Sequence, residues 1–312
     1  MSQPSPTPER RPRRHGRRLR LTVAGLVLLG IAGYGAYYVV ESRTQRAGCT
    51  VAADGDTMKL ESQQAANAST IAAVATSRGL PERALTIALA TSMQESMLRN
   101  LDHGDRDSLG LFQQRPSQGW GTPEQIMDPV HATNEFFDGL VKIEGYARLP
   151  LTVAAQEVQK SAFPQAYAKH EADATLLTSA LTGRRPGALN CVLGSGETVT
   201  TGDPARVRTA LAREFGPRVA PRPAEGRAGG GTARERTVQV PSGPAGGAAG
   251  DGKRRGWELA QWAVAHSADL KVEKVSFRDK QWRAADSGKG WQKSDTSAAE
   301  TADGDVRITV AQ

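Results

Sequence analysis

The residues with the clearest chemical potential lie between positions 93 and 114, and the first of them is Glu95. Glu95 stands near the end of an apolar stretch that predicts a helix, and an acidic loop follows it. Cleavage of a glycosidic bond needs a carboxylic acid whose pKa is raised by partial burial, so that it still carries a proton near neutrality. The dipole at a helix C-terminus also disfavours the carboxylate charge. Glu95 is therefore a candidate general acid, and the alternative is a solvated glutamate in the last turns of a helix.

Three aspartates in the following loop are candidates for a second carboxylate: Asp102, Asp105 and Asp107. An inverting glycosidase needs a second carboxylate about 6.5 to 9.5 Å from the acid in order to activate water. Each aspartate could equally be an ordinary loop or turn residue. The loop therefore leaves the choice between a one-carboxylate and a two-carboxylate mechanism open.

Glu95-Ser96 and Gly110-Leu111-Phe112-Gln113, with Asp102-His103-Gly104 before the turn, resemble the active-site region of the lysozyme-like superfamily. The resemblance is to lytic transglycosylases and goose-type lysozymes in particular, and it covers roughly residues 62–182. It implies a mainly α, lysozyme-like α+β fold, Glu95 as acid and base, no cofactor, and the glycan strands of peptidoglycan as substrate. In a lytic transglycosylase the sugar's own 6-hydroxyl attacks, so that no second carboxylate is needed.

The sequence departs from this family at two places. Phe112 replaces the usual Met of the turn, and both are bulky and apolar. The Tyr-Asn-Ala-Gly segment that lines the sugar site of many transglycosylases is missing, and residues 155–161 stand in its region. Trp120 could stack on a sugar or pack in the core. The residues expected to orient the acid or to bind the sugar are Ser96, Gln113, Gln114 and Trp120.

The helical pattern continues through most of this region. Apolar spacing and capping signals predict helices over 62–78, 81–95, 128–140, 152–160 and 164–181. Strong strand signals are missing between residues 62 and 182. The pattern therefore agrees with a mainly helical domain, to which we assign residues 49–191.

The two cysteines of the chain, Cys49 and Cys191, bracket this domain. Outside the cell a disulfide between them is expected, and closure of so long a loop could contribute up to about 5 kcal/mol in the chain-entropy model. The alternative is two unpaired buried thiols. Two distant cysteines and five scattered histidines do not predict a metal site.

The N-terminal region predicts a membrane anchor. Residues 1–20 hold seven Arg and one Glu, and residues 21–40 carry no charge over a length that can cross a bilayer as a helix. The arginines place the N-terminus in the cytoplasm and the bulk of the chain outside the cell. The alternatives are a cleaved signal peptide and a lipoprotein signal that ends at Cys49. Because the tail holds most of the net charge of +7, nucleic acid is not an expected partner.

The C-terminal part predicts a linker and a small unit. The composition of residues 192–256 predicts one short helix, over 205–215, and a Gly- and Pro-rich disordered linker. Residues 257–312 read as a small α+β unit with strands over 274–277 and 305–310. This unit resembles a C-terminal domain of actinobacterial cell-wall proteins whose intact members end in a His- and Asp-rich motif, but here His266 has no partner histidine there. We therefore expect a noncatalytic module.

Taken together, the sequence predicts a membrane-anchored, extracellular enzyme that cleaves peptidoglycan glycan strands, as a lytic transglycosylase or a muramidase. The first rival is a noncatalytic peptidoglycan-binding or scaffolding protein that retains the lysozyme-like fold, a role favoured by the missing sugar-site segment. A second rival is a transporter, against which a single predicted span argues.

Overall fold

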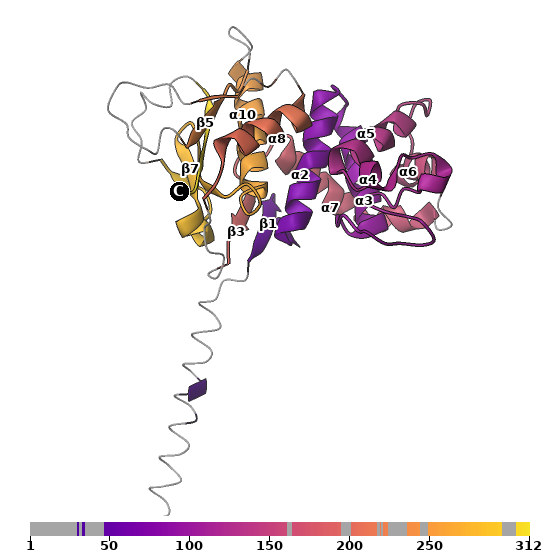
Figure 1. The fold of residues 1–312 in the computed structure, drawn as a ribbon, viewed down its shortest axis with the longest axis horizontal. Coiled ribbons are helices and arrows are strands. Elements are labelled where there is room, and N and C mark those ends of the chain that lie inside the picture. The colour runs from indigo at the N-terminus through magenta and orange to yellow at the C-terminus, as the bar shows by residue number, and fades with distance from the viewer. Residues whose placement is uncertain are drawn as a thin grey trace, which may run out of the picture. The chain divides into compact units, whose positions relative to one another are not determined.

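The computed structural model describes residues 30, 33–34, 47–160, 164–194, 201–216, 219, 221–223, 236–243, 249–294 and 304–312. The chain forms two compact units, Met1–Gln45 and Arg46–Gln312. The second unit, called the body below, holds the helices and strands labelled in Figure 1.

The first correction concerns the predicted membrane-spanning helix over residues 21–40. Most of this range lies outside the described residues, which include only Gly30, Gly33 and Tyr34 of it. Among all the residues that the structure describes, no helix combines the length and the apolar character needed to cross a bilayer. The predicted fold class, which includes an N-terminal transmembrane helix, is therefore wrong in this respect.

The body begins with a small antiparallel sheet. Strand β1 (Gly48–Ala53) lies between β2 (Asp56–Leu60) and β3 (Leu189–Val192), so that the chain returns to this sheet after the helical region. Asp54 and Gly55, which join β1 to β2, have φ angles of 56° and 95°. Two successive left-handed residues suit a two-residue hairpin loop, where Asp and Gly are favoured.

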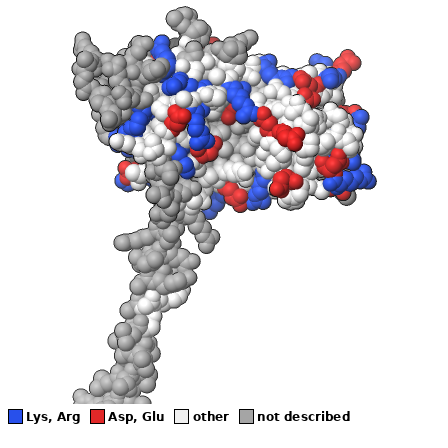
Figure 2. All heavy atoms as spheres, viewed as in Figure 1, with Lys and Arg blue, Asp and Glu red and all other residues white. Residues whose placement is uncertain are grey.

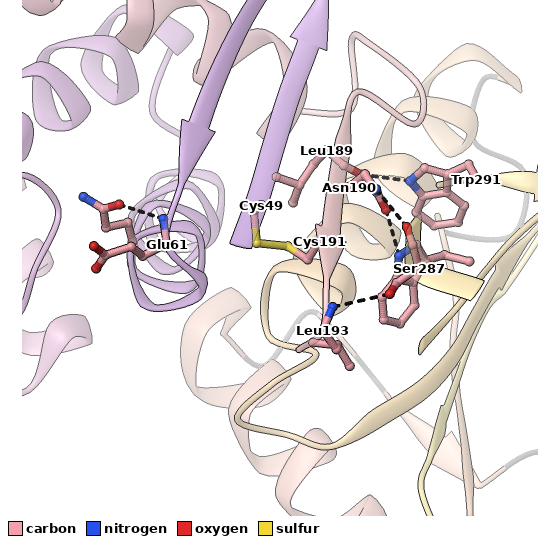
Figure 3. The surroundings of a disulfide bond; sticks show 10 residues. Cys49, Glu61, Leu189, Asn190, Cys191, Leu193, Ser287 and Trp291 are labelled. Carbon is pink, nitrogen blue, oxygen red and sulfur yellow. Dashed lines mark hydrogen bonds between the residues drawn. A yellow bond between two sulfur atoms is a disulfide. The ribbon is translucent and has the colours of Figure 1, made fainter. Parts of the chain in front are cut away.

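The predicted disulfide is confirmed and lies within this sheet. Cys49 on β1 is directly opposite Cys191 on β3, and their sulfur atoms are bonded (Figure 3). Both cysteines are buried, at 2% and 1% exposure. The bond closes a loop with a sequence separation of 142, which contains the whole helical region.

The helical region follows β2. Its helices are α2 (Ser62–Ser77), α3 (Glu82–Ser96), α4 (Pro123–Ile126), α5 (Pro129–Leu140), α6 (Leu151–Gln159) and α7 (Glu171–Leu181), with 3₁₀ segments η1 (Pro116–Gln118) and η2 (Pro164–His170). Helix α2 starts with a capping box between Glu61 and Gln64. It is rich in Ala and buried over most of its length, which lets α3, α5, α8 and α10 pack closely around it.

The C-terminal part of the body is a larger antiparallel sheet with helices packed on it. Its elements are α8 (Pro204–Phe215), β4 (Arg222–Pro223), β5 (Thr237–Val240), α10 (Ala249–Ala265), β6 (Val272–Phe277), β7 (Lys280–Arg283), η3 (Ala284–Lys289), β8 (Gln292–Lys293) and β9 (Val306–Val310). The strand order is β4-β5-β9-β6-β7-β8. Helix α10 packs on β6 and β9, and buries Trp262 completely.

The second correction concerns the division of the fold into a mainly helical domain, a disordered linker and a small α+β unit. Strand β5 and the start of α10 fall within residues 192–256, the range predicted to be a linker, although parts of that range lie outside the described residues. The sequence signal failed because β5 is short and gains its order from pairing with β9. The body is thus about half helical with two antiparallel sheets.

Hydrogen bonds join the C-terminal part to the helical region. Gln261 on α10 donates through Nε2 to the Ala180 carbonyl oxygen at 2.6 Å and accepts at Oε1 from the Leu189 N–H at 3.0 Å. Thr76 on α2 donates to Glu258 on α10 at 2.5 Å. Because Gln261 is fully buried and both of its amide atoms have partners, this contact is an integral part of the core.

The outer edge of β3 is covered by side chains from the C-terminal part (Figure 3). Trp291 Nε1 donates to the Leu189 carbonyl oxygen at 2.9 Å, and the Leu193 N–H donates to Ser287 Oγ at 3.3 Å. Asn190 Nδ2 donates to the Ser287 carbonyl oxygen at 3.0 Å. Strand β3 is therefore held by β1 on one side and by the C-terminal part on the other.

Candidate functional site

Glu95 lies in the last turn of α3, and the chain leaves this helix through an unusual turn. Met97 and Leu98 have φ angles of 54° and 60°. Their carbonyl oxygens accept hydrogen bonds from Gln64 Nε2 and Asn67 Nδ2 of α2, both at 2.7 Å. Helix α2 thus fixes the end of α3, and with it the position of the Glu95 side chain.

The Glu95 carboxyl group is half-buried and has two polar neighbours. Tyr167 in η2 donates its hydroxyl to Glu95 Oε1 at 2.7 Å. Burial raises the pKa of Glu95 above its usual value, and hydrogen bonds from Tyr167 and Gln159 offset part of that rise. Glu95 therefore keeps its proton to a higher pH than a solvated glutamate does, as a general acid must.

The turn formed by residues 110–113 is bound tightly to α3. Ser92 and Ser96 both donate to the Leu111 carbonyl oxygen, at 3.1 and 2.8 Å. Gly110 has a φ of 77°, and a Cβ at this position would come within 2.7 Å of the Ile126 carbonyl oxygen. The glycine is therefore required by both backbone conformation and space, and Ser96, proposed from the sequence to orient the acid or the sugar, holds this turn.

Phe112 and Gln159 connect this turn to the neighbouring helices. Phe112 is fully buried and stacks on Phe136 of α5, with ring centroids 4.6 Å apart. Gln159, at the end of α6, donates through Nε2 to the Phe112 carbonyl oxygen at 2.7 Å. The turn, α6 and η2 thus converge on Glu95.

The other residues proposed to bind substrate take different places. Gln113 is partly exposed and donates to the carbonyl oxygens of His103 and Gly110, both at 3.3 Å. Gln114 is 1% exposed and donates to the Ala132 carbonyl oxygen at 3.0 Å, so that it anchors the turn to α5. Trp120 is half-buried and packs against the hydrophobic core. Gln113 and Trp120 are thus both partly exposed, whereas Gln114 is buried.

The three candidate aspartates lie in the loop between α3 and the turn. Asp102 and Asp105 are exposed, and a hydrogen bond from His103 Nδ1, at 2.8 Å, lowers the pKa of Asp102. Asp107 accepts from the Ser117 N–H at 2.8 Å and from Arg115 Nε at 2.6 Å, and these bonds hold its pKa well below the usual range. Asp107 therefore serves to close the loop.

Sequence reasoning missed Tyr167 and Gln159. Gln159 lies in residues 155–161, the segment that replaces Tyr-Asn-Ala-Gly. Tyr167 lies in residues 164–181, which were predicted as one helix but form two elements, η2 and α7. Tyr167 is 72 residues from Glu95 in sequence, and its only local signal is a tyrosine that needs a partner for its hydroxyl when buried. The hydrogen bond between Tyr167 and Glu95 therefore forms only when the fold brings η2 against α3.

Two further properties of the described part of the body bear on its chemistry: the distribution of surface charge and the possible metal ligands. On the face shown in Figure 2, basic and acidic side chains lie side by side over the body. Within the described ranges, no group of three or more His, Cys, Asp or Glu side chains has the geometry to hold a metal ion. The chemistry available at Glu95 is thus that of a half-buried carboxyl group with hydroxyl and amide partners.

Replacement of Tyr167 by Phe tests the link between Tyr167 and Glu95. The change removes a hydrogen bond that favours the carboxylate, so the pKa of Glu95 should rise further. If Glu95 acts as a general acid, activity falls as the pH passes its pKa, so the descending limb of the kcat/KM profile should move to higher pH, by about 1 to 2 units. Tyr146→Phe is the matched control. An unchanged limb would contradict the pairing.

The comparisons with known proteins concern the C-terminal part. A family model described as VldE, C-terminal domain, matches residues 205–304. This match begins in α8 and extends past β8, so it groups α8 with the larger sheet and does not reach Glu95. A search of curated proteins finds no match for the chain.

Proposed function

We propose that the body cleaves the glycan strands of peptidoglycan, with Glu95 as general acid and base. The observation that carries this proposal is the half-buried Glu95 carboxyl group, whose pKa is raised by burial and whose Oε1 accepts the Tyr167 hydroxyl at 2.7 Å. The substrate class comes from the resemblance of residues 95–113 to lytic transglycosylases and goose-type lysozymes. On the face shown in Figure 2, basic and acidic side chains are mixed, without the continuous basic patch that nucleic acid binding favours.

In the proposed reaction, protonated Glu95 donates its proton to the glycosidic oxygen as the bond from that oxygen to C1 breaks. The sugar's own 6-hydroxyl then attacks C1 and returns its proton to the Glu95 carboxylate, so that a 1,6-anhydro ring forms. Water would give a reducing end instead. Asp107 is held by Arg115 and Ser117, whereas Asp102 and Asp105 are exposed, so the ends of the products decide between the two routes.

The Cys49–Cys191 disulfide supports a location outside the cytoplasm, since disulfides persist in oxidising compartments. Peptidoglycan lies in such a compartment. The location and the substrate of this proposal are thus mutually consistent.

The proposal is tested by digestion of purified peptidoglycan with residues 46–312, which form one compact unit, followed by mass spectrometry of the soluble products. We expect products with 1,6-anhydromuramyl ends. Reducing ends would replace the transglycosylase assignment with that of a muramidase. Unchanged glycan together with sedimentation of the protein on the insoluble wall would instead favour the noncatalytic binding role.

A further inference from the structure

Gly104 lies in the acidic loop between α3 and the turn, and its backbone does not require a glycine. Its φ angle lies outside the left-handed range, whereas Gly110 has a φ of 77°. A Cβ at position 104 would overlap Gln113 Oε1 and would lie 2.9 Å from Gln113 Cδ. The missing side chain of Gly104 therefore leaves the space that the Gln113 amide group occupies.

The Gln113 amide group is held in this space by its nitrogen atom. Nε2 donates to the carbonyl oxygens of His103, in the loop, and Gly110, in the turn, both at 3.3 Å. An amide nitrogen has two hydrogen atoms, so these two bonds use both of them. The polar atom that remains is Oε1, for which no hydrogen-bond donor is found within the described ranges. A ligand that meets this side chain therefore finds an acceptor.

The backbone that carries the Gln113 side chain lies next to the Glu95 carboxyl group. Gln159 Nε2 donates to the Phe112 carbonyl oxygen at 2.7 Å, and the same side chain forms a hydrogen bond with Glu95. The Phe112 carbonyl belongs to the peptide group that joins Phe112 to Gln113. Because Gly104 is exposed and Gln113 is partly exposed, this amide group is open to solvent beside the candidate acid.

We propose that Gly104 is a positioning residue for glycan binding, which acts by leaving room for the Gln113 amide group and so presents Gln113 Oε1 to a hydroxyl or acetamido N–H group of the sugar. This inference rests on the function proposed above. The hydrogen bonds of Nε2 select the ligand chemistry, because an acceptor needs a donor on the ligand and does not need a charge.

A second role for Gly104 predicts a different outcome. A Cβ at position 104 would also lie 2.8 Å from the Ser108 carbonyl oxygen, so the glycine could serve only the packing of the loop. In that case the effect of Gly104→Ala would not depend on Gln113. If Gly104 acts through Gln113, the added methyl group has no further effect on binding once the Gln113 side chain is removed.

The test measures binding of the trimer of N-acetylglucosamine to residues 46–312 that carry Glu95→Gln, so that the probe is not consumed. Gly104→Ala and Gln113→Ala should each raise the dissociation constant by about 2-fold to 10-fold, the usual worth of one hydrogen bond. The double variant should bind no more weakly than either single variant. Gly252→Ala is the matched control and should bind as the parent does, because a Cβ there has its nearest contact at 3.7 Å.

Two further measurements separate positioning from a general loss of structure. The side-chain amide resonances of Gln113, assigned with Gln113→Ala, should shift in Gly104→Ala and stay in place in Gly252→Ala. With Glu95 intact, Gly104→Ala should raise KM and leave kcat nearly unchanged, because the contacts of Glu95 do not involve the Gln113 side chain.

Three results would overturn the inference. The first is an unchanged Gln113 amide signal in Gly104→Ala, and the second is unchanged binding by that variant. The third is a loss of binding that Gly104→Ala adds in full on top of Gln113→Ala, which would assign the glycine to packing against Ser108. If the parent binds neither the trimer nor peptidoglycan and the wild type cleaves no glycan, the function proposed for Glu95 fails, and this inference fails with it.

Discussion

Replacement of Glu95 by Gln is expected to lower the turnover of peptidoglycan by about 10²-fold to 10⁴-fold, the usual worth of a positioned proton transfer. The amide keeps the size of the side chain and can still accept the Tyr167 hydroxyl, but it has no proton to transfer. Glycan binding and the melting temperature should change little. The measurement is the release of soluble products per unit time by the wild type and the variant.

A matched control for this experiment is Glu157→Gln, which makes the same chemical change at an exposed position on α6. Its turnover should match that of the wild type. Asp102→Asn, Asp105→Asn and Asp107→Asn separate the mechanisms, because only a hydrolase that uses one of them as a base loses its water-activating group. A Glu95→Gln variant with full activity would rule out Glu95 as the acid.

The double variant Cys49→Ala/Cys191→Ala is expected to lose about 2 to 5 kcal/mol of stability, because the disulfide closes a very long loop in the unfolded chain. For a body of this size, that loss corresponds to a fall in melting temperature of about 5 to 20 °C. Alanine suits both positions because both cysteines are buried. The measurement is thermal unfolding with and without reductant.

Reductant should lower the melting temperature of the wild type and leave the double variant unchanged. Thr50→Ala, on the same strand as Cys49, is the matched control and should respond to reductant as the wild type does. Two titratable thiols in the folded, unreduced wild type would contradict the bond.

The sequence predicted those features of the fold that depend on local signals. Capping residues and apolar spacing placed α2, α3, α5, α6 and α8 close to their observed ranges. The disulfide agrees with the prediction from two cysteines that bracket the helical region, and β6 and β9 followed from two short apolar runs. These predictions succeeded because the residues that carry each signal lie within the helix, the strand or the cysteine pair that they predict.

Features that depend on distant contacts could not be predicted. Tyr167 reaches Glu95 only because η2 packs against α3, and β5 is ordered by a strand about 70 residues later. The expected linker was read from composition, which does not register pairing between distant short strands. The roles expected of Ser96 and Gln114 came from position in a motif, whereas burial and hydrogen bonds place both in the support of the turn.

The covered edge of β3 also bears on how the protein avoids self-association. Leu189 and Leu193 use backbone groups that point away from β1 to bind Trp291, Gln261 and Ser287. An uncovered strand edge is a template on which a second chain can add a strand. Because its protection comes from side chains encoded about 70 to 100 residues later, a chain still being synthesised exposes this edge until the C-terminal part is complete. Protection of this strand edge therefore depends on the whole body.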